Sequence, residues 1–348
     1  MERTVERLLG VRVVDRADLG SSNLAPVARL VLDREYDGIG RTVIVKGRRL
    51  DNLAWGTGDA FQRNERRALE HLQPTGLAPK LLATSVGTDE YDQVLVLSDL
   101  GPGPTVQQLL FGDDPEAATE GLLAMARLAA ELHTAVDPDF EAAHEIQFLD
   151  QPLNLWPPLV EAAAELDFPP PGDVELRRLA DDLQRRTAFT HGDFTPGNVV
   201  LGNGEARLVD LEGAGRRHPG LDAACLRLPF PHYGYWATIP DQVLNQLDAT
   251  YRSATGDPAH DGMMATGSAA WAIIRASRLR LIASSDQAPA EALRRRTQIV
   301  HTLTAAAACM RAVYPNLSSW LDQLSDAMRL RWAEARQPPR TFQGFRSV

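Results

Sequence analysis

Short hydrophobic runs, separated by polar or glycine-containing turns, fill the first hundred residues. Runs of this length and composition are typical of β-strands. The pattern predicts five strands, at Val11–Val14, Val27–Leu32, Thr42–Lys46, Lys80–Thr84 and Val94–Leu97. One helix is predicted at Asp59–Leu72, because its apolar residues fall on one helical face and Gly76 follows its end. We therefore expect a small, mostly antiparallel α+β lobe.

The turn residues Gly101–Pro104 mark a change from strand-like to helical spacing of the hydrophobic residues. The spacing beyond them predicts helices over Leu122–Val136, Ala269–Leu279, Glu291–Val313 and Ser318–Ala335. We expect two lobes, residues 1–100 and 101–348, joined by a linker at about 98–104, and a loose tail from Pro338. The fold class is α+β, with a small antiparallel-sheet N-terminal lobe and a larger, mainly helical C-terminal lobe.

The main exception to the helical pattern lies within Phe189–Asp210. Two apolar runs, Val199–Leu201 and Arg207–Leu211, flank the turn Gly202–Gly204, which is typical of a β-hairpin.

Composition and charge favour some classes of function over others. The 348 residues exceed one typical domain, and 44% hydrophobic residues argue against disorder. A net charge of −10 disfavours a nucleic-acid partner and suits a cationic substrate. Two cysteines without metal-ligand spacing, a charged start and no long apolar run lead us to expect a cytoplasmic protein without a membrane partner. A monomer and a homodimer both stay open.

The segment His191–Asn198 carries the strongest chemical pattern, because Asn198 follows Asp193 by five positions. Asp210 comes at the end of the predicted hairpin. Phosphoryl transfer needs a carboxylate that accepts the proton of the attacking hydroxyl, and hard oxygen ligands that hold Mg²⁺. A loop followed by a hairpin can bring these three side chains together, although polar turns also favour these residue types.

This segment resembles the signature of the aminoglycoside phosphotransferase and choline kinase superfamily, which has a two-lobed protein-kinase-like fold. The resemblance implies that Asp193 is the catalytic base, that Asn198 and Asp210 bind magnesium, and that His191 braces the loop. Phe194-Thr195 replaces the Leu-His common in the family, and Leu211 replaces an aromatic residue. Glu212 could support the site or face the substrate.

The N-terminal lobe supplies further candidates for binding nucleotide. Val43–Lys46 is an apolar strand that ends in a lysine, whose ammonium could neutralise phosphate oxygens. The resemblance implies that Glu65 is its ion-pair partner, with Glu70 as the alternative. Ser21 and Ser22 lie in a small-residue loop that could approach phosphates, although an ordinary hairpin turn fits equally well. The resemblance places adenine recognition on the backbone of the linker, at Ser98 and Leu100.

Two later segments resemble parts of the same family. Asp222, in Pro219–Ala224, is expected to support the catalytic loop, and His133 is expected to pack within a helix. An aromatic segment at 229–236 could line the acceptor pocket and bind a cation through its rings, or it could simply pack on the helical lobe. Its candidate substrate residues are His232, Tyr233, Tyr235 and Trp236.

These patterns lead to a small-molecule kinase that uses ATP, or GTP, and Mg²⁺ to phosphorylate a hydroxyl group. Acceptor candidates are aminoglycoside-like antibiotics, amino sugars and amino alcohols, so antibiotic resistance, biosynthesis and primary metabolism all stay open as roles. One alternative is a non-catalytic kinase-like module that binds nucleotide for regulation. Another is a metallohydrolase with His191 and Asp193 as ligands. The chain lacks a Walker A sequence and the A-P-E element of protein kinases.

Overall fold

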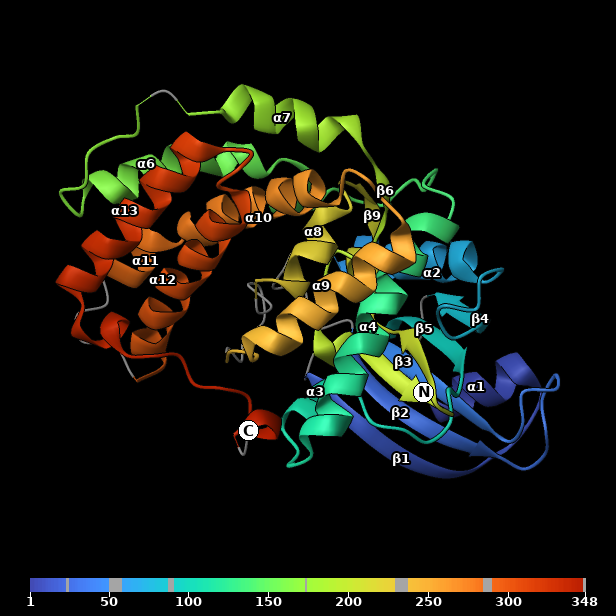
Figure 1. The fold of residues 1–348 in the computed structure, drawn as a ribbon. Coiled ribbons are helices and arrows are strands. Elements are labelled where there is room, and N and C mark those ends of the chain that lie inside the picture. The colour runs from blue at the N-terminus through green and yellow to red at the C-terminus, as the bar shows by residue number, and fades with distance from the viewer. Residues whose placement is uncertain are drawn as a thin grey trace. The chain divides into compact units, whose positions relative to one another are not determined.

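The computed structural model describes residues 1–22, 25–49, 58–86, 91–172, 174–228, 237–283 and 290–346. These residues form a five-stranded antiparallel sheet, two small two-stranded sheets and many helices (Figure 1). The predicted α+β fold class is therefore confirmed. The chain divides into two compact units. The sheet unit comprises residues 1–104, 140–144 and 198–214, and the helical unit comprises 105–139, 145–197 and 215–348.

The sheet unit is built on an antiparallel sheet in the order β1-β2-β3-β5-β4. Its strands are β1 (Val13–Ser22), β2 (Ala25–Leu32), β3 (Thr42–Arg49), β4 (Leu81–Val86) and β5 (Tyr91–Ser98). All five predicted strands are present, each extending beyond its hydrophobic run at one end or both, but β1 starts at Val13 rather than Val11 and β4 at Leu81 rather than Lys80. Lys46 lies in the middle strand β3, where it pairs with Val27 on β2 and with Leu95 on β5.

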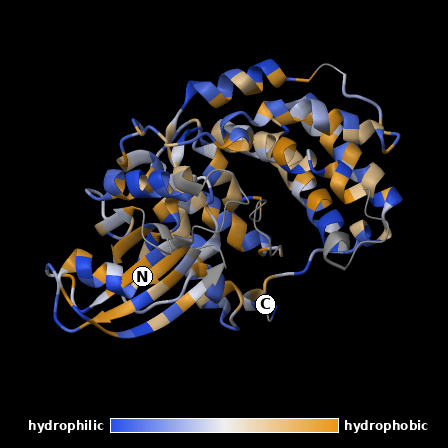
Figure 2. Cartoon of the chain, turned by 180° about the vertical axis from the view of Figure 1, so that it is seen from behind, coloured by the Kyte–Doolittle hydropathy of each residue, from blue (hydrophilic) through white to orange (hydrophobic). Residues whose placement is uncertain are grey.

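One face of this sheet forms a hydrophobic core. Side chains alternate between the two faces of a strand, and Figure 2 shows hydrophobic and hydrophilic residues alternating along these strands. Val43 and Val45 are fully buried on the core face, while Lys46 belongs to the opposite face. Helix α1 (Glu2–Leu9) covers the core with Val5 and Leu9. The hydrophobic pattern did not predict α1, because two buried residues in a charged octapeptide make a weak signal.

The sheet unit also takes in two short segments from later in the chain. One is the predicted hairpin, with strands β7 (Val199–Gly202) and β8 (Glu205–Leu208). Backbone hydrogen bonds from Leu201 N to Pro104 O (2.9 Å) and from Leu208 N to Leu77 O (2.8 Å) attach it to residues 1–104. The second strand ends at Leu208 rather than at Leu211, because Asp210 adopts a left-handed conformation with φ of 62°.

The other inserted segment, residues 140–144, lies along α2 (Gly58–Leu72), the predicted helix of this unit. The rings of Phe61 and His144 have centroids 4.1 Å apart, and those of His71 and Phe140 are 5.4 Å apart. These contacts reach both ends of the helix. Residues 140–144 therefore act as a strap along one side of α2.

The helical unit holds most of the secondary structure of the chain. Its strands β6 (Ala188–Thr190) and β9 (Gly215–Arg217) form an antiparallel pair. Its helices are α3 (Val106–Leu110), α4 (Pro115–Ala135), α5 (Gln147–Asp150), α6 (Trp156–Ala164), α7 (Leu176–Arg185), α8 (Gly220–Ala223), α9 (Asp241–Thr255), α10 (His260–Ala276), α11 (Leu279–Ala283), α12 (Ala290–Met310) and α13 (Pro315–Arg331). The described residues also form short 3₁₀ helices, which are η2 (Pro152–Leu155), η3 (Pro196–Asn198), η4 (Leu211–Gly213), η5 (Ala224–Leu226), η6 (Ala333–Arg336) and η7 (Gln343–Phe345). Of these, η4 belongs to the sheet unit, and η3 includes the last residue of one segment of the helical unit and the first of a segment of the sheet unit.

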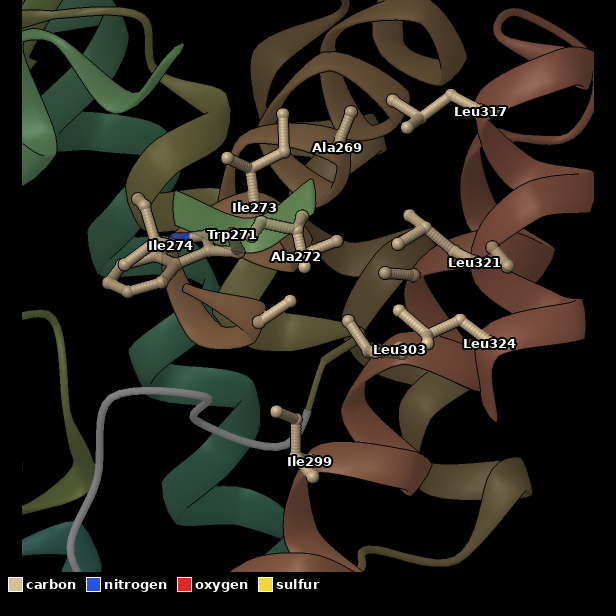
Figure 3. Close-up of a cluster of buried hydrophobic side chains, with 14 of the residues drawn as sticks. Ala269, Trp271, Ala272, Ile273, Ile274, Ile299, Leu303, Leu317, Leu321 and Leu324 are labelled. Atoms are coloured by element: carbon tan, nitrogen blue, oxygen red, sulfur yellow. The ribbon is translucent and has the colours of Figure 1, made fainter. Parts of the chain in front are cut away.

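The core of the helical unit forms where α10, α12 and α13 pack together. Figure 3 shows Ile273 of α10, Leu303 of α12 and Leu321 of α13 among the side chains that gather between these helices. Trp271 is also buried, and its indole N–H donates to Leu221 O at 2.6 Å. The predicted helix at Ala269–Leu279 is two helices, since α10 ends at Ala276 and α11 starts at Leu279.

The C-terminal tail is anchored, so the expectation of a loose tail was wrong. Thr238 N donates to Arg340 O (2.7 Å), and Phe342 N donates to Thr238 O (3.1 Å). The ring of Phe342 is almost fully buried and packs edge-on against Phe111, with centroids 5.9 Å apart. Two buried aromatic residues, Phe342 and Phe345, hold the tail in place, although proline and charged residues around them hide this hydrophobic signal in the sequence. No helix in the described part of the chain is long and apolar enough to cross a membrane.

Two glycines of α10 provide a test of the packing between α8 and α10. A Cβ atom on Gly267 would lie 2.0 Å from Gly220 O, whereas one on Gly262 would meet nothing within 4 Å. We predict that Gly267→Ala lowers the free energy of unfolding by about 1–3 kcal/mol, because the backbones must separate. Gly262→Ala should instead raise it by up to about 1 kcal/mol, because alanine favours the helix. Urea denaturation of both variants checks this, and equal effects would contradict the close approach.

Candidate active site

Lys46 lies between two carboxylates within the sheet unit. Its Nζ is 2.7 Å from Glu65 Oε2 on α2 and donates a hydrogen bond to Asp210 Oδ1. Only 11% of the Lys46 side chain and 2% of the Glu65 side chain are exposed. Glu70, the alternative partner, faces Arg66 instead, at 3.7 Å. In the structure the partner of Lys46 is thus Glu65, while Glu70 lies further along α2 and pairs with Arg66.

The charge of Lys46 is stabilised by these neighbours. Burial by itself lowers the pKa of a lysine, because the charged form loses water. The negative charges of Glu65, Asp210 and Glu212 more than offset this effect and raise the pKa of Lys46 above its ordinary value. Lys46 therefore carries a full positive charge at neutral pH, enclosed in protein and directed at carboxylates.

Asn198 and Asp210 lie at the same end of the β7–β8 hairpin. Val209 N donates to Asn198 O at 3.0 Å, so the backbone next to Asp210 is joined directly to Asn198. Asp210 has φ of 62° and ψ of 57°, a left-handed conformation that aspartate tolerates better than most residues. An amide oxygen and a carboxylate on adjacent backbone segments are hard donors of the kind that Mg²⁺ prefers. The two residues therefore fit a magnesium site in their chemistry.

Asn64 is a polar residue of this region to which the sequence assigned no role. Its Nδ2 donates to Glu212 O at 3.0 Å and to Ala214 O at 2.8 Å, just after Asp210. Glu212 itself lies in the turn η4, and its charge contributes to the raised pKa of Lys46. An asparagine inside a helix carries no distinctive pattern, so only its burial in the folded chain marks Asn64.

The predicted catalytic loop, His191–Asp193, is held within the helical unit by Asp222. Asp222 accepts hydrogen bonds from His191 N (2.6 Å) and Gly192 N (3.2 Å). Gly192 has φ of 79°, a conformation that glycine adopts without strain. The fully buried His191 ring accepts from Asp193 N at 3.2 Å through Nδ1. His191 thus binds the backbone of the loop, as a bracing residue would.

Asp222 is itself charged and buried. Burial raises the pKa of a carboxyl group, but the hydrogen bond with His133 and the backbone N–H of His191 lower the pKa of Asp222 below its usual value. His133 Nε2 lies 3.4 Å from Asp222 Oδ2, and its Nδ1 lies 2.8 Å from Tyr251 OH. His133 therefore links the support of the loop to α9, beyond the packing role that its helix suggested.

The remaining candidates are placed less completely. Ser21 and Ser22 end β1, where they pair with Pro26 and Ala25, while the turn after them lies outside the described residues. Ser98 N donates to Lys80 O, and Ser98 Oγ accepts from Lys80 N, both at 2.9 Å. The N–H of Ser98 is thus used within the sheet unit, so a contact between Ser98 and a base would use its carbonyl. Leu100 follows in the linker. The aromatic candidates at 232–236, which include His232, Tyr233, Tyr235 and Trp236, lie outside the described residues.

The metallohydrolase alternative finds no support in the described part of the chain. Among those residues, no group of three or more histidine, cysteine, aspartate or glutamate side chains could hold a metal ion. His191, its proposed ligand, directs Nδ1 to the backbone of Asp193.

Comparison with known proteins supports this reading of the fold. A family model described as "Phosphotransferase enzyme family" matches residues 49–265. The chain is similar in structure to a choline kinase from Cryptosporidium parvum Iowa II, with a TM-score of 0.54 and 12% identity over 88% of this chain and 93% of the other. It is also similar to a choline/ethanolamine kinase family protein from Mesorhizobium loti, with a TM-score of 0.51 and 16% identity over 91% and 93% of the two chains. No curated protein matches the sequence.

The ion pair of Lys46 and Glu65 leads to a prediction about stability. Lys46→Met leaves the buried Glu65 carboxylate without its cation and should lower the free energy of unfolding by about 3–5 kcal/mol. The double variant Lys46→Met/Glu65→Leu should recover most of this loss, because no buried charge is left uncompensated. Lys80→Met, at the exposed second lysine of the chain, serves as control in urea denaturation. A double variant no more stable than Lys46→Met would contradict the pairing.

His218, which precedes Asp222 by four positions, leads to a prediction about pH. Burial, aided by the charges of Arg186 and His133, lowers the pKa of His218 from 6.5 to about 4. The unfolded chain therefore takes up a proton at higher pH than the folded chain. The free energy of unfolding should fall by up to about 1.4 kcal/mol per pH unit as the pH decreases from about 6.5 to about 4.

The variant His218→Asn tests this pH dependence. Asparagine can still accept the hydrogen bond from Gly220 N that His218 Nδ1 accepts at 3.2 Å, but it does not titrate. Urea denaturation across this pH range should show a shallower slope for the variant than for the unchanged protein. Identical slopes would show that His218 has the same pKa in the folded and the unfolded chain, which would contradict the prediction.

Proposed function

Because the chain belongs to the phosphotransferase enzyme family, whose model matches residues 49–265, we propose that it transfers the γ-phosphoryl group of ATP to a hydroxyl group of a small molecule. The observation that carries this proposal is the cluster formed by the buried Lys46 and Glu65 with the partly exposed Asp210. A fully charged lysine, held by one carboxylate and next to a second, suits the binding of phosphate oxygens.

In this proposal the sheet unit binds the nucleotide. Lys46 contacts the phosphates, and Glu65 keeps its ammonium in place from the rigid helix α2. Asn198 and Asp210 would hold Mg²⁺, which neutralises charge on the phosphate oxygens when it is bound. The carbonyl of Ser98 and the backbone of Leu100 would contact the base, and Ser21 and Ser22 would lie near the phosphates. GTP could replace ATP as donor.

The helical unit supplies the catalytic base. Asp193 would accept the proton of the attacking hydroxyl and orient its oxygen toward the γ-phosphorus. Two observations support this role. Asp222 binds two backbone N–H groups of the loop, and His191 binds the N–H of Asp193 itself. A loop held at three backbone positions can keep a carboxylate oriented, and such orientation is the main catalytic contribution that phosphoryl transfer requires.

The acceptor is proposed at the level of a chemical class. The net charge of −10 favours an amine-bearing acceptor, such as an aminoglycoside-like antibiotic, an amino sugar or an amino alcohol. The two structural relatives named above are a choline kinase and a choline/ethanolamine kinase family protein by name. At 12% and 16% identity, these similarities show the fold alone and do not identify the acceptor. The aromatic segment at 229–236 and Glu212 are the proposed contacts of the acceptor.

The reaction can be tested through ADP release with Mg²⁺ and ATP or GTP, against a panel of aminoglycosides, amino sugars, choline, ethanolamine and homoserine. We predict acceptor-dependent ADP release that Asp193→Asn reduces by at least about a hundredfold, since the amide cannot accept the proton. Asp241→Asn, an exposed position in the first turn of α9, serves as the matched control.

The result also separates the proposal from its alternative. Nucleotide binding without turnover on any acceptor would indicate a non-catalytic regulatory module. A chain that binds neither ATP nor GTP would contradict both readings.

A further inference from the structure

Asn64 joins three segments of the sheet unit through one buried side chain. It belongs to α2, directly before Glu65, and is fully buried. Its Nδ2 donates to the carbonyls of Glu212 and Ala214, at 3.0 and 2.8 Å, and its Oδ1 accepts from Ala143 N at 2.8 Å. Both ends of the amide are therefore used, by backbone groups that are far apart in the sequence.

The two carbonyls lie on either side of Gly213, in and after the turn η4 that follows Asp210. This turn begins with the left-handed backbone of Asp210, which local sequence preferences favour only weakly. Hydrogen bonds from outside the turn add to its internal bond from Ala214 N to Leu211 O (3.1 Å) and favour one conformation. Asn64 supplies two of them.

The helix that carries Asn64 is itself held in place. The strap at residues 140–144 contacts α2 through Arg67, whose guanidinium donates to Glu141 O at 3.3 Å, and through the rings of Phe61 and His71. Lys46 binds the next residue, Glu65, from the sheet. The strap and the sheet therefore hold α2 in place, and the hydrogen bonds of Asn64 hold the turn against α2.

Few side chains could replace this amide. The site needs two N–H donors for the carbonyls and one acceptor for Ala143 N, and an asparagine side chain offers both functions at the right length. Aspartate keeps the acceptor but would direct an oxygen at two carbonyl oxygens. Alanine keeps the helix and loses all three hydrogen bonds.

We propose that Asn64 is a positioning residue for the metal site. It fixes the turn η4, which follows Asp210, to α2, so that the carboxylates of Asp210 and Glu65 stay on Lys46. The inference rests on the proposed function, because it assumes that Asp210 binds the metal of the nucleotide. Asn64 itself touches neither metal nor nucleotide and acts through the backbone beyond Asp210.

Two measurements on Asn64→Asp and Asn64→Ala test this role. Hydrogen–deuterium exchange should be faster at residues 211–214 in both variants, because the turn opens more often once its carbonyls lose the Asn64 amide. At Ala143 it should be faster in Asn64→Ala alone, because aspartate keeps the oxygen that accepts from Ala143 N. The dissociation constant of Mn²⁺, measured by electron paramagnetic resonance with ATP present, should rise by about 10- to 100-fold, as for other residues that orient metal ligands. The full chain is used in both measurements.

Gln93→Ala is the matched control. Gln93 is also a buried amide of the sheet unit, 2% exposed, but it donates to Thr84 Oγ1 at 3.2 Å on the neighbouring strand, away from the turn. This variant should lose stability as the Asn64 variants do, while exchange at residues 211–214 and Mn²⁺ binding stay within about twofold of the unchanged protein.

The outcomes separate a positioning role from a purely structural one. Faster exchange with unchanged Mn²⁺ binding would overturn the proposal, since Asn64 would then hold the turn without affecting the metal. Unchanged exchange would overturn it as well. Failure of the unchanged protein to bind Mn²⁺ with ATP would instead refute the proposed function, while the exchange data would still decide whether Asn64 holds the turn.

Discussion

The buried positive charge of Lys46 is the constraint on which the sheet unit depends. An ammonium enclosed in protein is costly unless carboxylates surround it, and this chain brings them from two different segments. Glu65 comes from α2 and Asp210 from the turn after the β7–β8 hairpin, 164 positions away from Lys46. The central strand, the helix and the turn must therefore converge before the charge is compensated, so the same contacts that complete the fold also assemble the groups proposed to bind phosphate.

The helical unit meets a comparable constraint around Asp222. This carboxylate is 2% exposed and charged, and two backbone N–H groups of the predicted catalytic loop together with His133 compensate its burial. The backbone conformation of the loop thus directs two N–H groups at the buried carboxylate, which needs hydrogen-bond donors to stay charged. His133 in turn contacts Tyr251 on α9, so this demand extends into the packing of the long helices.

Two short segments, residues 140–144 and 198–214, belong to the sheet unit although their neighbours in the sequence belong to the helical unit. Contacts with residues far away in the sequence explain this. The strap at residues 140–144 connects α4 to α5 of the helical unit, yet it binds α2 of the sheet unit through Asn64, Arg67 and two ring contacts. Its sequence, Phe-Glu-Ala-Ala-His, is too short to show a strand or helix pattern. Its effect is to fix a helix whose Glu65 must stay on Lys46, a role that follows from position and not from composition.

The sequence by itself determined the elements that depend on local order, and its motifs led to the proposed chemistry. Short apolar runs predicted all five strands, and apolar residues on one helical face predicted α2, because both patterns follow from backbone periodicity. The spacing of Asp193, Asn198 and Asp210 indicated phosphoryl transfer, because that reaction needs a base and metal ligands. Only the tertiary structure decided the rest. It chose Glu65 over Glu70, and it revealed Asn64, the strap and the anchored tail. These features depend on partners in other segments of the chain, from Lys46, 19 positions before Glu65, to Glu212, 148 positions after Asn64, and no local pattern encodes a contact whose free energy is gained only when distant segments meet.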